Sequence, residues 1–223
     1  QIFIMNFNFQ KARDLMVENQ LRPNKIKDPN ILGIFKEIKK EKFLPSDLEV
    51  LSYSDMDISL NSNRGYLKNL HIAQLIKYSE INKNHKILHI GALTGYVSII
   101  LSKLCLKVFV IENDESFREI LKKNIKNNNI NNIEISDGSY KEGLLSESPF
   151  DRIFIDEPIK EFNRSLLNQL DANLGKLIMI KKNKDYLSKA IKITKNYENY
   201  SEEFLFDVFS KYELYKEDER FVF

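Results

Sequence analysis

The sequence predicts an α/β fold, with a doubly wound, mostly parallel seven-stranded sheet, a helical N-terminal extension and an antiparallel C-terminal hairpin. From residue 86 onward, short apolar runs alternate with amphipathic runs of helical length, as parallel strands and crossover helices do. Residues 189–215 alternate without a helix between the runs, which indicates an antiparallel close of the sheet edge. The first 80 residues show helical spacing interrupted by prolines.

Three helices are expected in the N-terminal part. Apolar residues at helical spacing predict the first over residues 11–21. Asp28 is a suitable N-cap for the second, with Pro29 in its first turn. Residues 60–65 are polar and turn-like, and helical spacing resumes over residues 70–81.

The remaining elements follow in strict alternation. We expect strands over residues 86–90, 107–112, 132–136, 150–156 and 175–182, and helices over 96–104, 116–126 and 164–173. There is no internal repeat and no linker rich in glycine, serine or proline. We therefore expect one domain over residues 1–223, with a helical region over 1–80 and a core over 81–223.

Composition narrows the function. The chain has 34 Lys and Arg against 32 Asp and Glu, so it lacks the basic balance of a nucleic-acid-binding protein. Its single cysteine, Cys105, excludes an internal disulfide and a cysteine-rich metal site, and its histidines lack metal-ligand spacing. Charged residues interrupt the longest apolar stretch, so no membrane span is expected. We expect a cytoplasmic protein without a metal; the oligomeric state has no signature.

A glycine turn marks the first candidate ligand loop. In a doubly wound sheet, ligands lie at the carboxyl ends of the strands, beside the point where strand order reverses. GALTGY, residues 91–96, follows a strand and precedes a helix, and Gly91 and Gly95 allow the backbone to approach a ligand. A tight turn without a ligand explains the same pattern when it is taken alone.

Two further loops align with this turn. Glu112 stands at a strand end 21 residues after Gly91, where an acid typically binds ribose hydroxyls. Asp137 and Gly138 follow the next strand and would frame an adenine edge. A solvated charge and an Asp-Gly turn are the alternatives. Together the three loops predict a nucleoside site, and the absence of GxGxxG favours S-adenosylmethionine over a dinucleotide.

Several segments carry a resemblance to a known family. They are ARDLMVENQLRPNKIKDPNIL, EKFLPSDLEVLSYSD, IGALTGY, SPFDRIFID and LLNQLDANLGKLIMI. Over nearly its whole length the chain resembles protein-L-isoaspartate O-methyltransferases, and the N-terminal segments are the most specific. The resemblance implies a Rossmann-like methyltransferase fold and transfer of a methyl group from S-adenosylmethionine to an isoaspartyl carboxylate of a damaged protein. That carboxylate is already ionised at neutral pH, so no strong general base is needed and no catalytic residue is assigned.

The resemblance also implies a set of site residues. The region over 1–80 would form the substrate side and the core over 81–223 would bind the cofactor, with Glu112 holding the ribose. Asp156 and Glu157 would face the methionine end or the substrate mouth. The expected cofactor-binding residues are Gly91, Ala92, Thr94, Gly95, Tyr96, Glu112, Asn113, Asp137, Gly138 and Asp156.

Departures from the family pattern leave alternatives open. His89 stands where an acid is usual, and Leu93 replaces a glycine of the cofactor turn. Leu67 stands where the substrate loop usually carries a serine, so Arg64, Tyr66 and Leu67 are the substrate-proximal candidates. One alternative is a non-catalytic relative that binds a partner, and another is a different acceptor. The methyltransferase interpretation depends on an adenosyl-shaped cleft at the strand ends, and it fails if Leu93 or a neighbour fills that cleft with Glu112 turned away.

Overall fold

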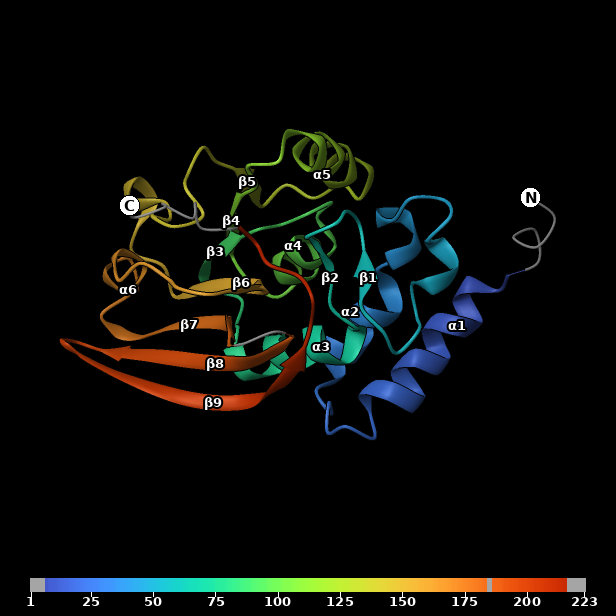
Figure 1. Cartoon of the computed structure of the whole chain (residues 1–223), viewed down its shortest axis with the longest axis horizontal. Helices are drawn as coiled ribbons and strands as arrows, with labels where there is room; N and C mark the ends of the chain where they lie inside the picture. The colour runs from blue at the N-terminus through green and yellow to red at the C-terminus, as the bar shows by residue number, and fades with distance from the viewer. Residues whose placement is uncertain (1–6, 184–185, 216–223) are drawn as a thin grey trace, which may run out of the picture.

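The computed structural model describes residues 7–183 and 186–215 and confirms the predicted fold class (Figure 1). Its main sheet has seven strands in the order β5-β4-β3-β6-β7-β8-β9. Neighbours from β5 to β7 run parallel, while β8 and β9 are antiparallel. The strands are β3 Lys86–Ile90, β4 Lys107–Ile111, β5 Ile133–Ile135, β6 Arg152–Ile159, β7 Asn173–Lys182, β8 Leu187–Asn196 and β9 Asn199–Phe209.

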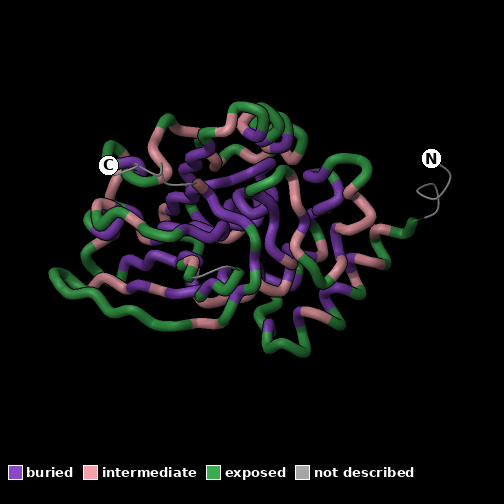
Figure 2. The backbone as a smooth tube through the Cα atoms, in the orientation of Figure 1, coloured by how far each residue is buried: buried purple, intermediate pink, exposed green. Residues whose placement is uncertain are grey.

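Helices cover both faces of this sheet, and each face has its own hydrophobic cluster (Figures 1 and 2). The elements α3 Asn69–Ser79, α4 Tyr96–Ser102 and α5 Glu115–Asn127 contribute to the cluster that contains Ile87. Leu88 and Ile90 point to the other cluster, as alternation along β3 requires. That cluster includes side chains of α6 Ser165–Asn168 and lies near the short turn η5 Leu145–Glu147.

The helix predicted over residues 164–173 is wrong in length. Only α6 Ser165–Asn168 is an α-helix, because the chain then pairs with the start of β6. Phe150 donates its N–H to Gln169 O at 2.8 Å and accepts from Asp171 N at 2.8 Å. Tertiary hydrogen bonds thus replace the helical ones that the local sequence favours.

The N-terminal region packs against one end of the sheet and forms α1 Phe9–Met16, the π-helix η2 Val17–Leu21, α2 Pro29–Glu37, η3 Lys40–Phe43 and η4 Glu49–Leu51. The expected cap is confirmed, since Asp28 Oδ1 accepts from Asn30 N at 2.8 Å. The expected polar turn is the loop of an unpredicted hairpin, β1 Ile58–Ser59 with β2 Gly65–Tyr66.

A short segment after β9 crosses the carboxyl ends of the central strands (Figure 1). We call residues 210–215 the strap. Glu213 N donates to Asn63 O and Leu214 N to Pro158 O, both at 2.9 Å, so the strap joins the β1–β2 loop to β6. This segment lies in the part of the tail that alternation assigned to the hairpin.

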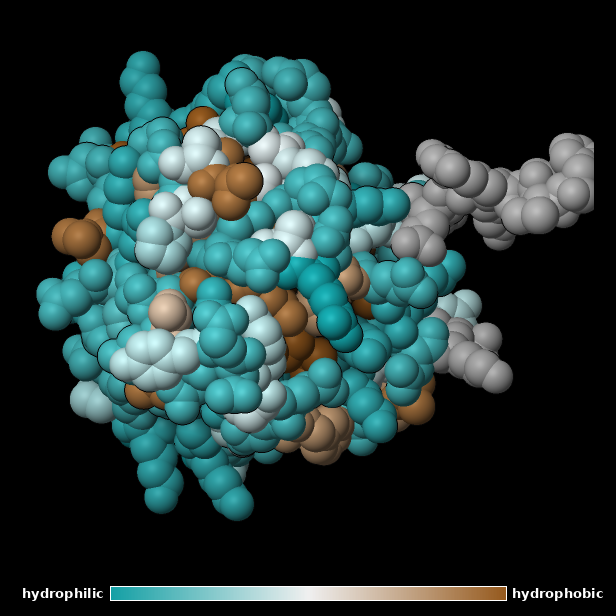
Figure 3. Space-filling view, turned by 90° about the vertical axis from the view of Figure 1, so that its left-hand side faces the viewer, coloured by the Kyte–Doolittle hydropathy of each residue, from teal (hydrophilic) through white to brown (hydrophobic). Residues whose placement is uncertain are grey.

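Figure 3 shows the side of the molecule that lies at the left in Figure 1. This face is mostly hydrophilic, with hydrophobic residues gathered in a central hollow. Within the described ranges, no helix combines the length and apolar character that a membrane span needs.

Candidate functional site

The candidate site lies at the switch point of the sheet. Strand β3 lies between β4 and β6, so strand order reverses beside the turn that follows β3. Ile90 pairs with Ile111, which brings Gly91 and Glu112 out of the sheet side by side. A register shift between Ile155 and Pro158 of β6 places Asp156 and Glu157 in an irregular stretch, a feature that commonly re-aims side chains near functional sites.

The glycine turn has the expected backbone but not the expected obstruction. Gly91 and Gly95 have φ values of +82° and +97°, which glycine adopts at little cost. Leu93 has φ +51°, and its side chain is buried in the hydrophobic core beside α5. The Leu93 N–H points the other way and donates to Glu112 Oε2 at 2.7 Å. Leu93 therefore leaves the cleft clear.

Glu112 follows β4 at the carboxyl ends of the central strands and is fully buried. Its Oε1 accepts from Asp114 N at 3.0 Å and from the Tyr140 hydroxyl, while its Oε2 accepts from Leu93 N. Three groups of the chain thus hold this carboxylate in place before any other partner is counted. Glu112 follows β4 beside the glycine turn, as the strand end and the spacing from Gly91 predicted, and its role in binding ribose stays a prediction.

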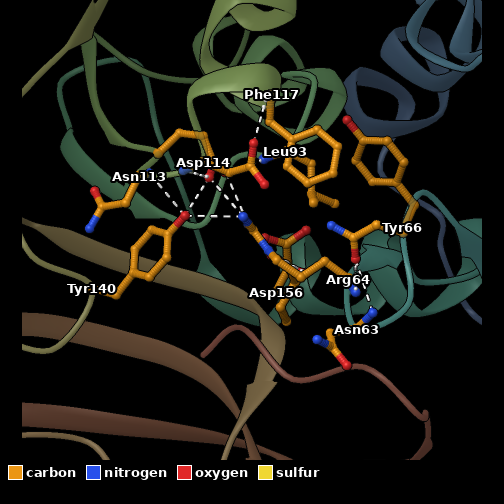
Figure 4. Close-up of polar contacts among 12 residues, drawn as sticks. Asn63, Arg64, Tyr66, Leu93, Asn113, Asp114, Phe117, Tyr140 and Asp156 are labelled. Atoms are coloured by element: carbon orange, nitrogen blue, oxygen red, sulfur yellow. Dashed lines mark hydrogen bonds and ion pairs between the residues drawn. The ribbon is translucent and has the colours of Figure 1, made fainter. Parts of the chain in front are cut away.

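The Arg64 side chain extends to the Tyr140 hydroxyl (Figure 4) and lies against Glu112. Its Nη1 lies 2.7 Å from Glu112 Oε1 and its Nη2 lies 2.9 Å from Glu112 Oε2, so the pair is bidentate. Its Nη2 also lies 2.6 Å from Glu157 Oε2, and its Nε lies 3.0 Å from the same oxygen. Burial alone would lower the pKa of Arg64, but the Glu157 and Glu112 carboxylates raise it above its ordinary value.

Aromatic rings complete the surroundings of this guanidinium. Arg64 Cζ lies 5.3 Å from the Phe117 ring centroid and 5.4 Å from that of Tyr140, and Nη1 lies 3.0 Å from the Tyr140 hydroxyl. Only 6% of the Arg64 residue is exposed. Cation–π contacts of this kind strengthen as the cation is desolvated. Arg64 is therefore held from all sides by groups suited to a flat cation.

A second buried polar chain lies beside it. His89 Nδ1 lies 2.8 Å from Ser98 Oγ, and His89 Nε2 lies 2.8 Å from Asp156 Oδ1, with all three residues buried. The imidazole thus fixes the orientation of Asp156.

The neighbouring acid Glu157 has a shifted pKa. Burial raises the pKa of Glu157 to about 8, against the opposing effect of Arg64.

The strap covers the remaining part of the cleft. A Cβ placed on Gly91 would overlap Leu214 Cδ1 and would lie 3.1 Å from Glu157 Oε2. The Tyr215 ring stacks on Tyr140, with centroids 6.4 Å apart. Arg64 and Leu214 therefore fill this region, but Glu112 is not turned away from it, because its carboxylate pairs with Arg64. An adenosyl cofactor fits this site only after both side chains move.

The other predicted residues fall into two groups. Ala92, Thr94, Tyr96, Tyr66 and Leu67 are buried toward the N-terminal region. There the Tyr66 hydroxyl lies 2.8 Å from Thr94 Oγ1 and accepts from Tyr96 N at 3.1 Å, so Tyr66 caps α4.

The second group lies at the rim of the cleft. Asn113 is exposed and donates its N–H to the Tyr140 hydroxyl at 2.9 Å. The Asp137 side chain is 90% exposed and pairs with Arg118 at 2.6 Å. Gly138 lies so close to Ile111 Cδ1 that a Cβ would be 2.6 Å from it. The structure therefore does not bring the Asp137 carboxylate to the Glu112 cluster.

Sequence reasoning missed Phe117, Tyr140 and the strap. Phe117 fits the apolar face of α5, so its sequence pattern gives no sign that its ring also contacts Arg64. Tyr140 follows the Asp137–Gly138 turn by two residues, and its place on a ligand loop is the signal that could have found it. No local pattern marks the strap as a cover.

Comparisons with known proteins agree on one family. The family model for protein-L-isoaspartate(D-aspartate) O-methyltransferase matches residues 11–206. A protein-L-isoaspartate O-methyltransferase from Methanoculleus marisnigri is 26% identical over 169 residues, 76% of each chain. Protein-L-isoaspartate O-methyltransferase 1 from Syntrophobacter fumaroxidans is 29% identical over 174 residues, 77% of this chain and 80% of the relative. A solved protein-L-isoaspartate O-methyltransferase matches with TM-score 0.74 and 20% identity, over 90% of this chain and 64% of its own.

Proposed function

Because this chain belongs to the protein-L-isoaspartate(D-aspartate) O-methyltransferase family, we propose that it methylates isoaspartyl carboxylates of damaged proteins with S-adenosylmethionine. The transfer takes place in the cleft at the ends of β3, β4 and β6. One observation carries this assignment to the site: Glu112 faces the cleft and is fixed by the N–H of Leu93 in the glycine turn. Family membership does not favour the non-catalytic alternative.

Glu112 is the residue that holds the ribose in this proposal. A buried carboxylate at this position, once Arg64 has left it, can accept a hydrogen bond from a ribose hydroxyl. Gly91 and Gly95 keep the turn close to the cofactor, and Asp156 faces its methionine end from β6. Ala92, Thr94 and Tyr96 support the turn from behind, while Asn113, Asp137 and Gly138 form the adenine rim.

The acceptor enters from the N-terminal side. The β1–β2 loop carries Arg64 and lies across the cleft from the glycine turn, so residues 1–80 supply the substrate side and residues 81–223 the cofactor side. Tyr66 and Leu67 shape this side through packing, since both are buried. Because the attacking carboxylate is already ionised, positioning and desolvation supply the rate enhancement.

The proposal extends to partners and location. The acceptor is a protein or peptide carboxylate rather than a nucleic acid, given the balanced charge of the chain. Cys105 is buried, and burial raises the pKa of its thiol to about 12, which suits a reduced cytoplasmic protein.

Methyl transfer from tritiated S-adenosylmethionine to a synthetic isoaspartyl peptide tests the function. We expect incorporation that the matched aspartyl peptide does not support. Glu112→Ala should lower cofactor affinity by about tenfold to a hundredfold, since it removes charge-assisted hydrogen bonds to the ribose. Background incorporation into both peptides by the folded wild-type protein would refute the proposal.

A further inference from the structure

The cleft contains a fully built binding site for a guanidinium, and the chain's own Arg64 fills it. The guanidinium uses two separate edges. Its Nη1–Nη2 edge pairs with Glu112 at 2.7 and 2.9 Å, and its Nε–Nη2 edge pairs with Glu157 at 3.0 and 2.6 Å. Phe117 and Tyr140 flank the group. Such planar, two-edged pairing is specific to arginine.

The pairing of the Nη1–Nη2 edge with Glu112 competes directly with the cofactor for this carboxylate. The oxygens of Glu112 that would accept from ribose hydroxyls already accept from Arg64, Leu93, Asp114 and Tyr140. No lone pair of this carboxylate remains for two more donors. Cofactor and Arg64 therefore cannot use Glu112 at the same time.

The backbone of Arg64 is held in place, so the exchange involves its side chain. Asn61 Oδ1 accepts from Arg64 N at 2.7 Å and from Asn63 N at 3.0 Å, and Arg64 O accepts from Leu60 N at 3.0 Å. This turn therefore anchors Arg64 at the substrate side of the cleft. The pairing of Arg64 Nε and Nη2 with Glu157 does not depend on Glu112.

The charge of the cleft creates a need for this arginine. Glu112 and Asp156 are buried close to one another, beside Glu157, whose pKa is raised by burial, and an isoaspartyl acceptor brings one more carboxylate. Like charges in a buried site repel strongly. The sulfonium of S-adenosylmethionine offsets part of this charge, and Arg64 is a cation of the protein that is already in contact with Glu112 and Glu157.

We propose that Arg64 serves the two substrates in turn, holding Glu112 while the cofactor is absent and binding the acceptor carboxylate once the cofactor has taken Glu112. The inference rests on the proposed function. Entry of the cofactor moves the guanidinium away from Glu112, and its Nη1–Nη2 fork is then free to pair with the acceptor carboxylate. Arg64 thereby favours binding of the cofactor before the acceptor and replaces the hydroxyl that Leu67 lacks.

Calorimetry with S-adenosylhomocysteine and peptide kinetics at saturating S-adenosylmethionine test this exchange on Arg64→Gln. We expect the variant to bind S-adenosylhomocysteine at least about tenfold more tightly, because the competing state is gone. Its KM for the isoaspartyl peptide should rise about tenfold to a hundredfold. The control Arg22→Gln removes an equal charge from an exposed ion pair with Glu18 and should change neither value.

Glu157→Gln provides a second variant if Arg64→Gln does not fold. It keeps Glu112 intact and weakens one anchor of Arg64, so S-adenosylhomocysteine should again bind more tightly. Unchanged or weaker binding by a folded variant, or an unchanged peptide KM for Arg64→Gln, would overturn the inference. A wild-type protein that methylates no isoaspartyl peptide would instead refute the proposed function, and the S-adenosylhomocysteine comparison would still test the competition.

Discussion

Replacement of Gly91 by alanine tests whether the strap closes on the cofactor turn. Gly91 has φ +82°, and an alanine in this left-handed region costs about 1–2 kcal/mol. The new Cβ would also overlap Leu214 Cδ1, the end of a buried side chain that must shift. Overpacking of this kind costs about 1–3 kcal/mol. We therefore expect Gly91→Ala to lower the free energy of unfolding by about 2–5 kcal/mol.

A double-mutant cycle separates the two contributions. Leu214→Ala removes the overlapping atoms, so in that background Gly91→Ala should cost only the backbone contribution. The expected coupling between the two positions is about 1–3 kcal/mol, measured by urea denaturation. Gly33→Ala is the matched control, since Gly33 lies in α2 with no atom within 4 Å of its would-be Cβ. It should stabilise the protein by about 0.5–1 kcal/mol.

A coupling below about 0.5 kcal/mol would show that Leu214 does not pack on Gly91 in solution. The strap would then lie outside the cleft, and Arg64 would be the remaining side chain that blocks the cofactor. A coupling of the expected size that disappears at saturating S-adenosylhomocysteine would show that the ligand displaces the strap.

Three further outcomes are expected. Burial lowers the pKa of His71 to about 4, so the protein should lose stability as pH falls from about 6.5 to 4. His71→Phe should reduce that loss, which thermal unfolding at each pH measures. Burial raises the pKa of Glu157, so the stability that its neutral form gives falls as pH rises from about 4.5 through 8, and Glu157→Gln should abolish that slope. Glu41→Ala leaves the buried Arg13 guanidinium without its carboxylate and should cost about 3–5 kcal/mol in urea unfolding, whereas Glu18→Ala, which removes exposed ion pairs with Arg22 and Lys36, should cost far less. A Glu157→Gln variant that keeps the wild-type slope between about pH 6.5 and 8, or equal costs for the two glutamates, would contradict these expectations.

The sheet could be predicted because its signals are local. Apolar runs of strand length and the amphipathic face of α5 bury their residues whatever lies further along the chain. Glu112 was found in the same way, since a strand end and a fixed spacing from Gly91 determine its place. The β1–β2 hairpin was missed because its strands have two residues each, too few to show alternation.

The filling of the cleft could not be predicted from local patterns. Arg64 is 48 residues from Glu112 and 93 from Glu157, and no periodicity relates the three positions. The sequence marked Arg64 only as a substrate-proximal candidate in a polar turn, and the tertiary fold is what buries it. The strap was missed for the same reason, because Leu214 and Gly91 lie far apart in the sequence and meet only in the folded chain.

The two departures in the cofactor region change less than the sequence suggests. Leu93 keeps the function of its position because the contact with Glu112 is made by its backbone, and its side chain packs into the core. His89 replaces an acid, but it orients the neighbouring acid Asp156 from β6, so the site retains a carboxylate at that end. The remaining feature of this site is the cation placed among these acids. Arg64 satisfies Glu112 and Glu157 in the absence of ligand, and an enzyme whose acceptor is itself a carboxylate can use the same guanidinium for that acceptor.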